Sequence, residues 1–209
     1  VFAQNADGSY DASQLVLGDE AGIAFADWLA TQGAAGSNVI NANIDGDRAR
    51  EFFLAGQSPY YLTGPWNIPA ISEAGINYAI DPLPSAGGQE AKPFVGVNGF
   101  FLSSKSTNAL AAANFIVNYL STEDAQLALY EVGGRPPALT AAYETAAAEN
   151  PDVKAFGQIG QTGAPMPAIP EMAAIWGPFG QAEAAVIAGE DVAEAVKAAG
   201  EAISEQIGG

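Results

Sequence analysis

Apolar residues recur at intervals of three or four positions through much of the chain, which is the spacing of one face of an α-helix. Near the C-terminus, one such stripe consists of Val192, Ala195, Val196, Ala199 and Ile203. Acidic residues precede several of these stretches and glycines follow them, where each type stabilises a helix end. The pattern predicts helices over residues 19–33, 47–55, 107–120, 121–132, 138–149, 178–188 and 191–207.

Shorter runs rich in β-branched and aromatic residues predict extended structure. The turn sequence Asn5-Ala6-Asp7-Gly8 divides residues 1–18 into two such runs and predicts a hairpin. Further extended runs are predicted at residues 59–62, 77–80 and 94–102. In the last of them, Gly96 and Gly99 favour a bend or a crossing between domains.

The segment Thr63-Gly64-Pro65-Trp66-Asn67 places a large aromatic side chain directly after a predicted strand. Gly64 and Pro65 end that strand, because glycine tolerates unusual φ angles and proline has no amide hydrogen to donate. Open α/β sheets bind ligands beyond the ends of their strands, so Trp66 is a candidate ligand-binding residue. The alternative is that Trp66 only packs over the strand end. Trp28 stands among apolar residues within a predicted helix and is assigned to the core.

A third tryptophan follows a segment that is stiffened by proline. Residues 164–172 contain Pro165, Pro167 and Pro170. Because proline restricts the backbone, this segment has little conformational entropy to lose on binding. Met166 lies within the segment and Trp176 follows shortly after it.

The charge of the chain argues against two classes of partner. It carries 7 Lys and Arg against 24 Asp and Glu, a formal net charge of −17 at pH 7. This charge repels phosphate backbones and anionic lipid, so we expect no nucleic-acid partner. No apolar run approaches the ~18 residues of a membrane-spanning helix.

The N-terminus predicts a processed or truncated product. Val1-Phe2-Ala3-Gln4-Asn5 has neither the basic start nor the apolar stretch of a signal peptide, and the chain does not begin with Met.

The chain contains no His and no Cys. Their absence excludes Ser-His and Cys-His catalysis, as well as zinc sites built on nitrogen or sulfur ligands. Any catalysis would rest on carboxylates, Lys, Tyr or Ser, and we expect neither a metal nor a cofactor. The composition therefore favours a binding protein over an enzyme.

Several stretches together resemble one family, in its order and spacing. They are Ala55-Gly56-Gln57 through Gly64-Pro65-Trp66, Lys92-Pro93-Phe94-Val95-Gly96-Val97, Asn118-Tyr119-Leu120-Ser121-Thr122-Glu123-Asp124 and Met166 through Trp176. The chain is similar to the C-terminal portion of the maltose/maltodextrin-binding proteins, family 1 extracellular solute-binding proteins that deliver sugar to ABC importers. The likeness extends over essentially all 209 residues.

This resemblance implies a two-lobed, hinged α/β fold of the periplasmic-binding-protein type II. Residues 1–97 and 151–209 would belong to the C-terminal lobe, and residues 98–150 would be a helical segment of the N-terminal lobe. The hinge would pass through Val97 and Asn98 and through Asn150 and Pro151. Most of the N-terminal lobe of the family would lie in a preceding stretch that this chain lacks.

The resemblance also implies a sugar site. Trp66 and Trp176 would stack on pyranose rings, and Met166 would form an apolar wall beside them. Glu171 is the one acidic residue beside these candidates, and we include it among the ligand-binding residues. Gly177 and Gly180 stand where maltodextrin-specific members have Tyr and Arg, so the resemblance does not specify the sugar.

The leading hypothesis is therefore a carbohydrate-binding component of an ABC sugar importer, with permease subunits as partners and no cofactor. Its expected location is extracellular or in the cell envelope, either periplasmic or lipid-anchored. One alternative is a glycoside hydrolase, which needs two carboxyl groups roughly 5–10 Å apart across a sugar. Another is a non-binding fragment whose exposed apolar surface is covered by the missing N-terminal half or by a second copy of the chain.

Overall fold

The computed structural model describes residues 1–85 and 90–208 and contains two compact units. Unit 1 consists of Val1–Ala49 and Pro167–Gly209, and unit 2 consists of Arg50–Met166. These units divide the chain at other positions than the predicted parts 1–97, 98–150 and 151–209. The assignment of those parts to two lobes stays a prediction.

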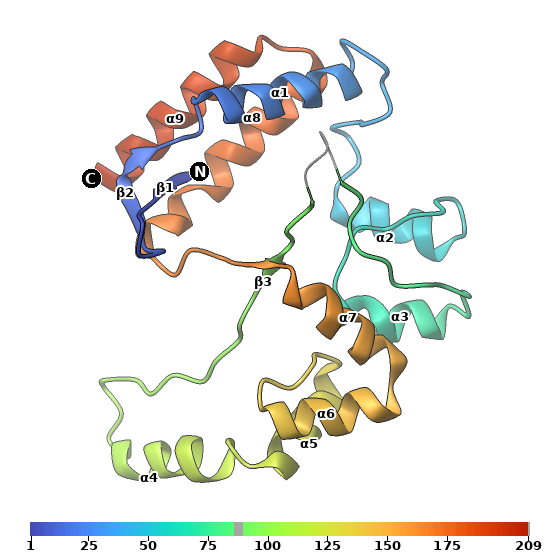
Figure 1. Ribbon diagram of the computed structural model, residues 1–209, viewed down its shortest axis with the longest axis vertical. Coiled ribbons are helices and arrows are strands. Elements are labelled where there is room, and N and C mark those ends of the chain that lie inside the picture. The colour runs from blue at the N-terminus through green and yellow to red at the C-terminus, as the bar shows by residue number, and fades with distance from the viewer. Residues whose placement is uncertain (86–89, 209) are drawn as a thin grey trace. The chain divides into compact units, whose positions relative to one another are not determined.

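Unit 1 combines a hairpin with three long helices (Figure 1). Its elements are β1 (Phe2–Gln4), β2 (Tyr10–Leu15), α1 (Glu20–Gln32), the 3₁₀ helix η3 (Pro170–Ala174), α8 (Trp176–Ala188) and α9 (Val192–Gly208). Strands β1 and β2 pair antiparallel, with Gln4 opposite Tyr10. The predicted hairpin is confirmed, and so are the helices at 19–33, 178–188 and 191–207.

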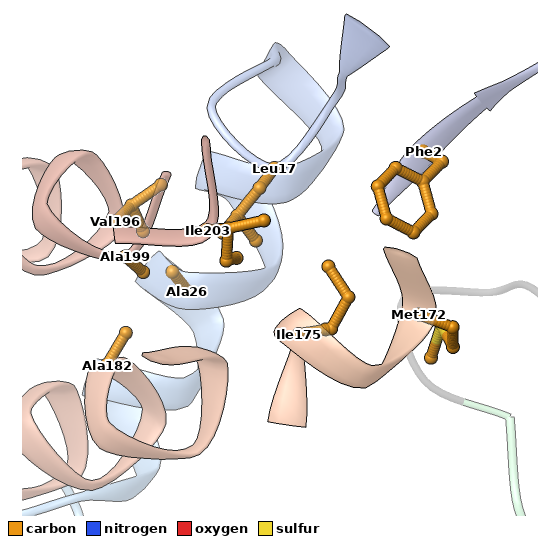
Figure 2. Close-up of a cluster of buried hydrophobic side chains, with 9 residues drawn as sticks. All are labelled: Phe2, Leu17, Ala26, Met172, Ile175, Ala182, Val196, Ala199 and Ile203. Atoms are coloured by element: carbon orange, nitrogen blue, oxygen red, sulfur yellow. The ribbon is translucent and has the colours of Figure 1, made fainter. Parts of the chain in front are cut away.

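The core of unit 1 forms where these elements meet. Figure 2 shows side chains from β1, α1, η3, α8 and α9 converging in one cluster, together with Leu17 from the segment between β2 and α1. Val196, Ala199 and Ile203 come from the predicted apolar stripe of α9, and all three are buried. Ile203 has no exposed surface. The spacing of apolar residues in the sequence therefore identified the buried face of α9.

In its described residues, unit 2 is mostly helical, with one short strand pair. Its elements are α2 (Gly46–Leu54, which begins in unit 1), the 3₁₀ helix η1 (Pro65–Asn67), α3 (Ile68–Glu73), β3 (Phe94–Val95), α4 (Ala109–Asn114), the π-helical turn η2 (Phe115–Tyr119), α5 (Glu123–Gly133), α6 (Thr140–Glu149), α7 (Pro151–Gln161) and β4 (Ala164–Pro165). Strands β3 and β4 pair in parallel. The helices predicted at 47–55, 107–120, 121–132 and 138–149 are confirmed.

Both ends of helix α5 carry residue types that favour the end of a helix. Thr122 caps its N-terminus by accepting a hydrogen bond from the amide of Ala125 at 3.4 Å. At its other end, Gly134 adopts a φ angle of 67°, a left-handed conformation that favours glycine.

Helix α7 was not predicted, because Gly157 and Gly160 argue against a helix. Pro151 occupies its first turn, where a missing amide hydrogen costs nothing. A Cβ atom on Gly157 would lie only 1.9 Å from the hydroxyl oxygen of Tyr143. The glycine therefore serves the close packing of α7 against α6, which the sequence alone does not reveal.

The strands predicted at 59–62 and 77–80 are wrong, since neither segment has regular secondary structure. Of the extended run at 94–102, only Phe94 and Val95 form a strand. These residues have strong β-propensity, but a strand also needs a hydrogen-bonded neighbour.

The assignment of Trp28 to the core is also wrong. Its side chain is 44% exposed and stacks on Phe25 with ring centroids 6.2 Å apart. On α1, Ala26 and Leu29 face the core instead. Trp28 lies beyond the edge of the buried face, which its apolar neighbours in sequence do not show.

We predict that Ile203→Ala lowers the free energy of unfolding by about 2–5 kcal/mol, because it leaves a cavity in the core of unit 1. Val39→Ala is the matched control, since Val39 belongs to the same unit and is 71% exposed. Its effect should stay within about 0.5 kcal/mol. Urea unfolding followed by circular dichroism measures both variants, and equal midpoints would contradict this description of the core.

A second prediction concerns Glu183 on α8, which lines an apolar pocket with Leu17, Phe25 and Leu29. Burial raises the pKa of this carboxyl above its usual value of 4.5. Folding thus disfavours the charged form of Glu183. The contribution of this carboxyl to the stability of the folded protein is fully present below the unfolded-state pKa, and it is lost as the pH rises through the folded-state pKa. We expect Glu183→Gln to raise the melting temperature at pH 7.

The same substitution should have a smaller effect near pH 4, where the parent carboxyl is protonated. Glu190→Gln serves as control, because Glu190 follows the end of the same helix and is exposed. A gain in melting temperature that is equal at both pH values would refute the role of charge burial.

Candidate functional site

Trp66 lies on η1, and its indole is held against the backbone of the preceding turn. A Cβ atom on Gly64 would lie 2.2 Å from the Cζ3 atom of the indole, so only glycine leaves room for the ring. Gly64 itself is buried, whereas the Trp66 side chain is 56% exposed. The indole therefore presents a supported face rather than filling a core.

The side chain of Asn67 holds this turn together. Its Nδ2 atom donates hydrogen bonds to Oγ1 of Thr63 at 2.7 Å and to the hydroxyl of Tyr61 at 3.1 Å. The ring of Tyr61 in turn contacts that of Phe53 on α2, with centroids 5.5 Å apart. Through these contacts, the segment before and after Trp66 is tied to a helix.

Trp176 is the first residue of α8 and is 54% exposed. The residues around it are anchored in the core of unit 1, since Met172, Ile175 and Pro178 are all buried. Figure 2 shows Met172 and Ile175 within the core cluster. Because its neighbours are fixed, Trp176 is a second exposed indole on a rigid support.

The other two predicted ligand-binding residues lie on the segment that leads to Trp176. Met166 directly follows β4 and is 42% exposed, while Glu171 is half-buried in η3. Glu171 and Trp176 thus lie on adjoining elements of unit 1. Trp66 and Met166 belong to unit 2.

The predicted hinge residues fall in two different settings. Val97 and Asn98 are exposed and lie in an irregular segment after β3. Asn150 separates α6 from α7 and accepts a hydrogen bond from the amide of Asp152 at 2.9 Å. Its Nδ2 atom also donates to the hydroxyl of Tyr130 at 2.8 Å. Pro151 is the first residue of α7.

The sequence analysis did not predict the hydrogen bonds of Asn67 or the hydrogen bond between Tyr78 and Asp152. Asn67 could have been noticed, because it directly follows Trp66 in a turn. The hydroxyl of Tyr78 donates a hydrogen bond to the carboxylate of Asp152, 74 positions away in sequence. No pattern among neighbouring residues predicts this contact. Burial, this hydrogen bond and the negative charge of Asp152 raise the pKa of Tyr78.

Two further features, a metal-binding cluster and a membrane-spanning helix, are absent from the described residues. Within ranges 1–85 and 90–208, no group of three or more acidic side chains is placed to hold a metal ion. In the same part of the chain, no helix combines the length and apolarity needed to cross a membrane.

Known proteins resemble the chain in sequence. The model of the family described as bacterial extracellular solute-binding protein matches residues 1–155. A galactooligosaccharide-binding protein of Bacillus subtilis is 30% identical over 99% of this chain and 50% of its own length. A maltooligosaccharide ABC transporter solute-binding lipoprotein of Streptococcus pneumoniae is 28% identical over 85% of this chain and 42% of its own length.

A solved structure resembles the chain as well. The maltotriose binding protein of Thermus thermophilus, bound with maltotriose, superimposes with a TM-score of 0.84 at 30% identity. The match covers 99% of this chain and 55% of that protein. The chain therefore spans about half the length of the relatives it matches.

These findings confirm the fold class, which is the α/β fold of the periplasmic-binding proteins, type II. They agree with the resemblance found in the motifs around Trp66 and Trp176. The chain belongs to the family of bacterial extracellular solute-binding proteins.

Proposed function

We propose that the chain is part of the carbohydrate-binding component of an ABC sugar importer, and that it binds an oligosaccharide of the maltodextrin type. The observation that carries this proposal is the pair of indoles, Trp66 and Trp176, each more than half exposed on a rigid support. The names of the relatives agree with it, since they bind galactooligosaccharide, maltooligosaccharide or maltotriose.

Exposed indoles suit sugar recognition for a physical reason. A pyranose ring presents C–H groups on its faces and hydroxyl groups around its edge, so it packs on an aromatic face and hydrogen-bonds sideways. In this proposal Trp66 and Trp176 are the stacking platforms, and Met166 adds apolar surface. Glu171 accepts hydrogen bonds from hydroxyl groups at the sugar edge.

We place the chain among binding proteins rather than enzymes. Hydrolysis of a glycosidic bond needs two carboxyl groups facing each other across the sugar. Among the proposed ligand-binding residues, Glu171 is the one carboxylate. The relatives are solute-binding proteins, which agrees with this assignment.

The proposal includes a hinge at Val97–Asn98 and at Asn150–Pro151, between lobes formed by residues 1–97 with 151–209 and by residues 98–150. The second crossing point is proposed where α6 ends and α7 begins. There Asn150 caps α7 through its side-chain oxygen and bonds Tyr130 of α5 through its side-chain nitrogen.

Partners and location follow from the same proposal. The permease subunits of an ABC transporter would receive the sugar, and the protein would act outside the cytoplasmic membrane, either in the periplasm or as a lipid-anchored protein. The family is extracellular by description, and a relative is named a lipoprotein.

The three tryptophans provide a matched test of the site. We expect Trp66→Ala and Trp176→Ala each to weaken maltotriose binding by about tenfold or more, because each removes a stacking face. Trp28→Ala should leave affinity unchanged, since Trp28 lies on α1 and is also a partly exposed tryptophan. Isothermal titration with a panel of oligosaccharides measures all three variants.

The titration is made on the 209-residue chain and on the product of its complete reading frame. Equal affinity of all three variants, or no sugar binding by the product of the complete reading frame, would reject the proposed site. Sugar recovered after incubation should be unchanged. Release of reducing sugar would favour the glycosidase instead.

A further prediction concerns the support of Trp66. Asn67→Leu keeps a side chain of similar size but removes the amide that donates to Tyr61 and Thr63, so the indole should become less restrained. With Trp28 and Trp176 replaced by Phe, the fluorescence anisotropy of Trp66 should fall; in the otherwise unchanged chain, Asn67→Leu should lower maltotriose affinity about 2–10-fold.

Asn114→Leu is the control, because it makes the same change at an exposed position on α4. Anisotropy that falls equally in both variants would show a general effect of replacing an asparagine. A substitution at Asn67 without effect on either readout would show that the turn holds Trp66 by other means.

A further inference from the structure

The C-terminal end of α5 packs against the turn that carries Trp66. Gly134, the residue that follows α5, adopts a left-handed conformation with a φ angle of 67°. A Cβ atom on Gly134 would lie 3.6 Å from Cγ of Pro69 and 3.9 Å from the carbonyl oxygen of Pro65. Both elements belong to unit 2, so this contact lies within one compact unit. The chain that leaves α5 therefore starts beside η1, whose middle residue is Trp66.

Arg135 is the next residue, and its backbone is restricted on both sides. Gly134 precedes it in the contact with η1, and Pro136 and Pro137 follow it. A residue before proline is confined to extended conformations, and each proline fixes its own φ angle. Arg135 is exposed. Its long side chain thus starts from a defined backbone position near Trp66 and is accessible to a ligand.

The guanidinium of Arg135 is not neutralised by a neighbouring carboxylate in the described part of the chain. Over residues 1–85 and 90–208, the one ion pair joins Lys197 and Glu201 at 3.8 Å. A guanidinium carries five N–H donors in a planar arrangement and has no acceptor. Arg135 can therefore offer these donors to an incoming molecule without first breaking an ion pair.

The proposed sugar site has few donors of this kind. Hydroxyl groups around a pyranose ring both donate and accept hydrogen bonds. The two indoles and Met166 offer mainly apolar surface, and an ionised Glu171 can only accept. Asn67, beside Trp66, already donates its side-chain N–H groups within the turn. The hydroxyl oxygens of a bound sugar thus need a donor from another part of the structure.

We propose that Arg135 is a further sugar-binding residue, which donates hydrogen bonds to hydroxyl oxygens of the pyranose stacked on Trp66. This inference rests on the proposed function. The guanidinium presents pairs of parallel N–H groups, so it suits a ring with two adjacent free hydroxyl groups. The preferred ligand is a neutral oligosaccharide, because the net charge of −17 repels an anionic one.

The alternative role of Arg135 is to stabilise α5. A cation near the C-terminus of a helix interacts favourably with the helix dipole, but this effect falls off beyond the last turn. Arg135 lies outside α5, which ends at Gly133. The two roles have different consequences. Loss of a dipole interaction lowers thermal stability, whereas loss of a sugar contact lowers affinity.

Isothermal titration with maltotriose tests the role of Arg135 in the product of the complete reading frame. We expect Arg135→Gln to weaken binding about tenfold or more, because a charged donor is lost. Its melting temperature should stay within about 2 °C of the parent value. Arg135→Lys keeps the charge but not the planar pair of donors, so it should recover only part of the affinity.

Arg48→Gln is the matched control for this titration. Arg48 is also exposed, and its guanidinium already donates to the carbonyl of Asn43 at 3.1 Å, so its loss should leave affinity unchanged. Full affinity of Arg135→Gln, where Trp66→Ala weakens binding, would overturn this inference and leave the proposed function standing. A fall in melting temperature of more than about 5 °C would assign the lost affinity to a weakened α5 and overturn it as well. A parent protein that binds no sugar would reject the proposed function itself.

Fluorescence quenching locates Arg135 without any sugar. With Trp28 and Trp176 replaced by Phe, Trp66 is the one remaining emitter, and nearby positive charge attracts the quencher iodide. Arg135→Gln should lower iodide quenching about twofold, as for a unit charge several ångströms away, and leave quenching by neutral acrylamide unchanged. Equal iodide quenching in parent and variant would place the guanidinium away from Trp66 and overturn the inference.

Discussion

A backbone amide that leaves water needs a hydrogen-bond partner, and this requirement explains the difference between the two units. Unit 1 meets it within its own residues, because β1 pairs with β2 and the helices pair internally. Unit 2 meets it in its helices. It also meets it in the two-residue pair of β3 with β4, whereas the described segments 59–62, 77–80 and 96–102 have no backbone–backbone hydrogen bond and are mostly exposed to water. A helix carries its partners along its own sequence, whereas a strand depends on another segment.

The exposed tryptophans depend on burial next to them. Met172 and Ile175 enter the core of unit 1 and so determine where Trp176 emerges. Two features determine the position of Trp66. Gly64 has no side chain and leaves room for the indole, and the hydrogen bonds of Asn67 fix the turn. In both places a polar or buried neighbour restricts the aromatic side chain, which lowers the entropy that binding a ligand would cost. The proposed stacking on sugar rests on this restraint as much as on the indoles themselves.

Sequence reasoning succeeded where the signal is local. The glycines that follow helices, such as Gly134 after α5, and the apolar stripe of α9 each predicted a feature that the structure contains. It failed at α7, because the reason for Gly157 is the hydroxyl of Tyr143 on another helix. It failed at Trp28 as well, since the buried face of α1 is decided by the neighbouring elements and not by hydrophobicity alone.

The sequence by itself determined most helices, the hairpin, the family motifs and the two tryptophans that we propose as platforms, because these follow from contacts within a few residues. Only the tertiary structure decided that Trp66 and Trp176 are exposed while Ile175 and Ile203 are buried. It also decided that Tyr78 meets Asp152 and that the predicted strands at 59–62 and 77–80 lack partners within the described chain. Exposure and strand pairing are properties of segments distant in sequence, so no local pattern contains them.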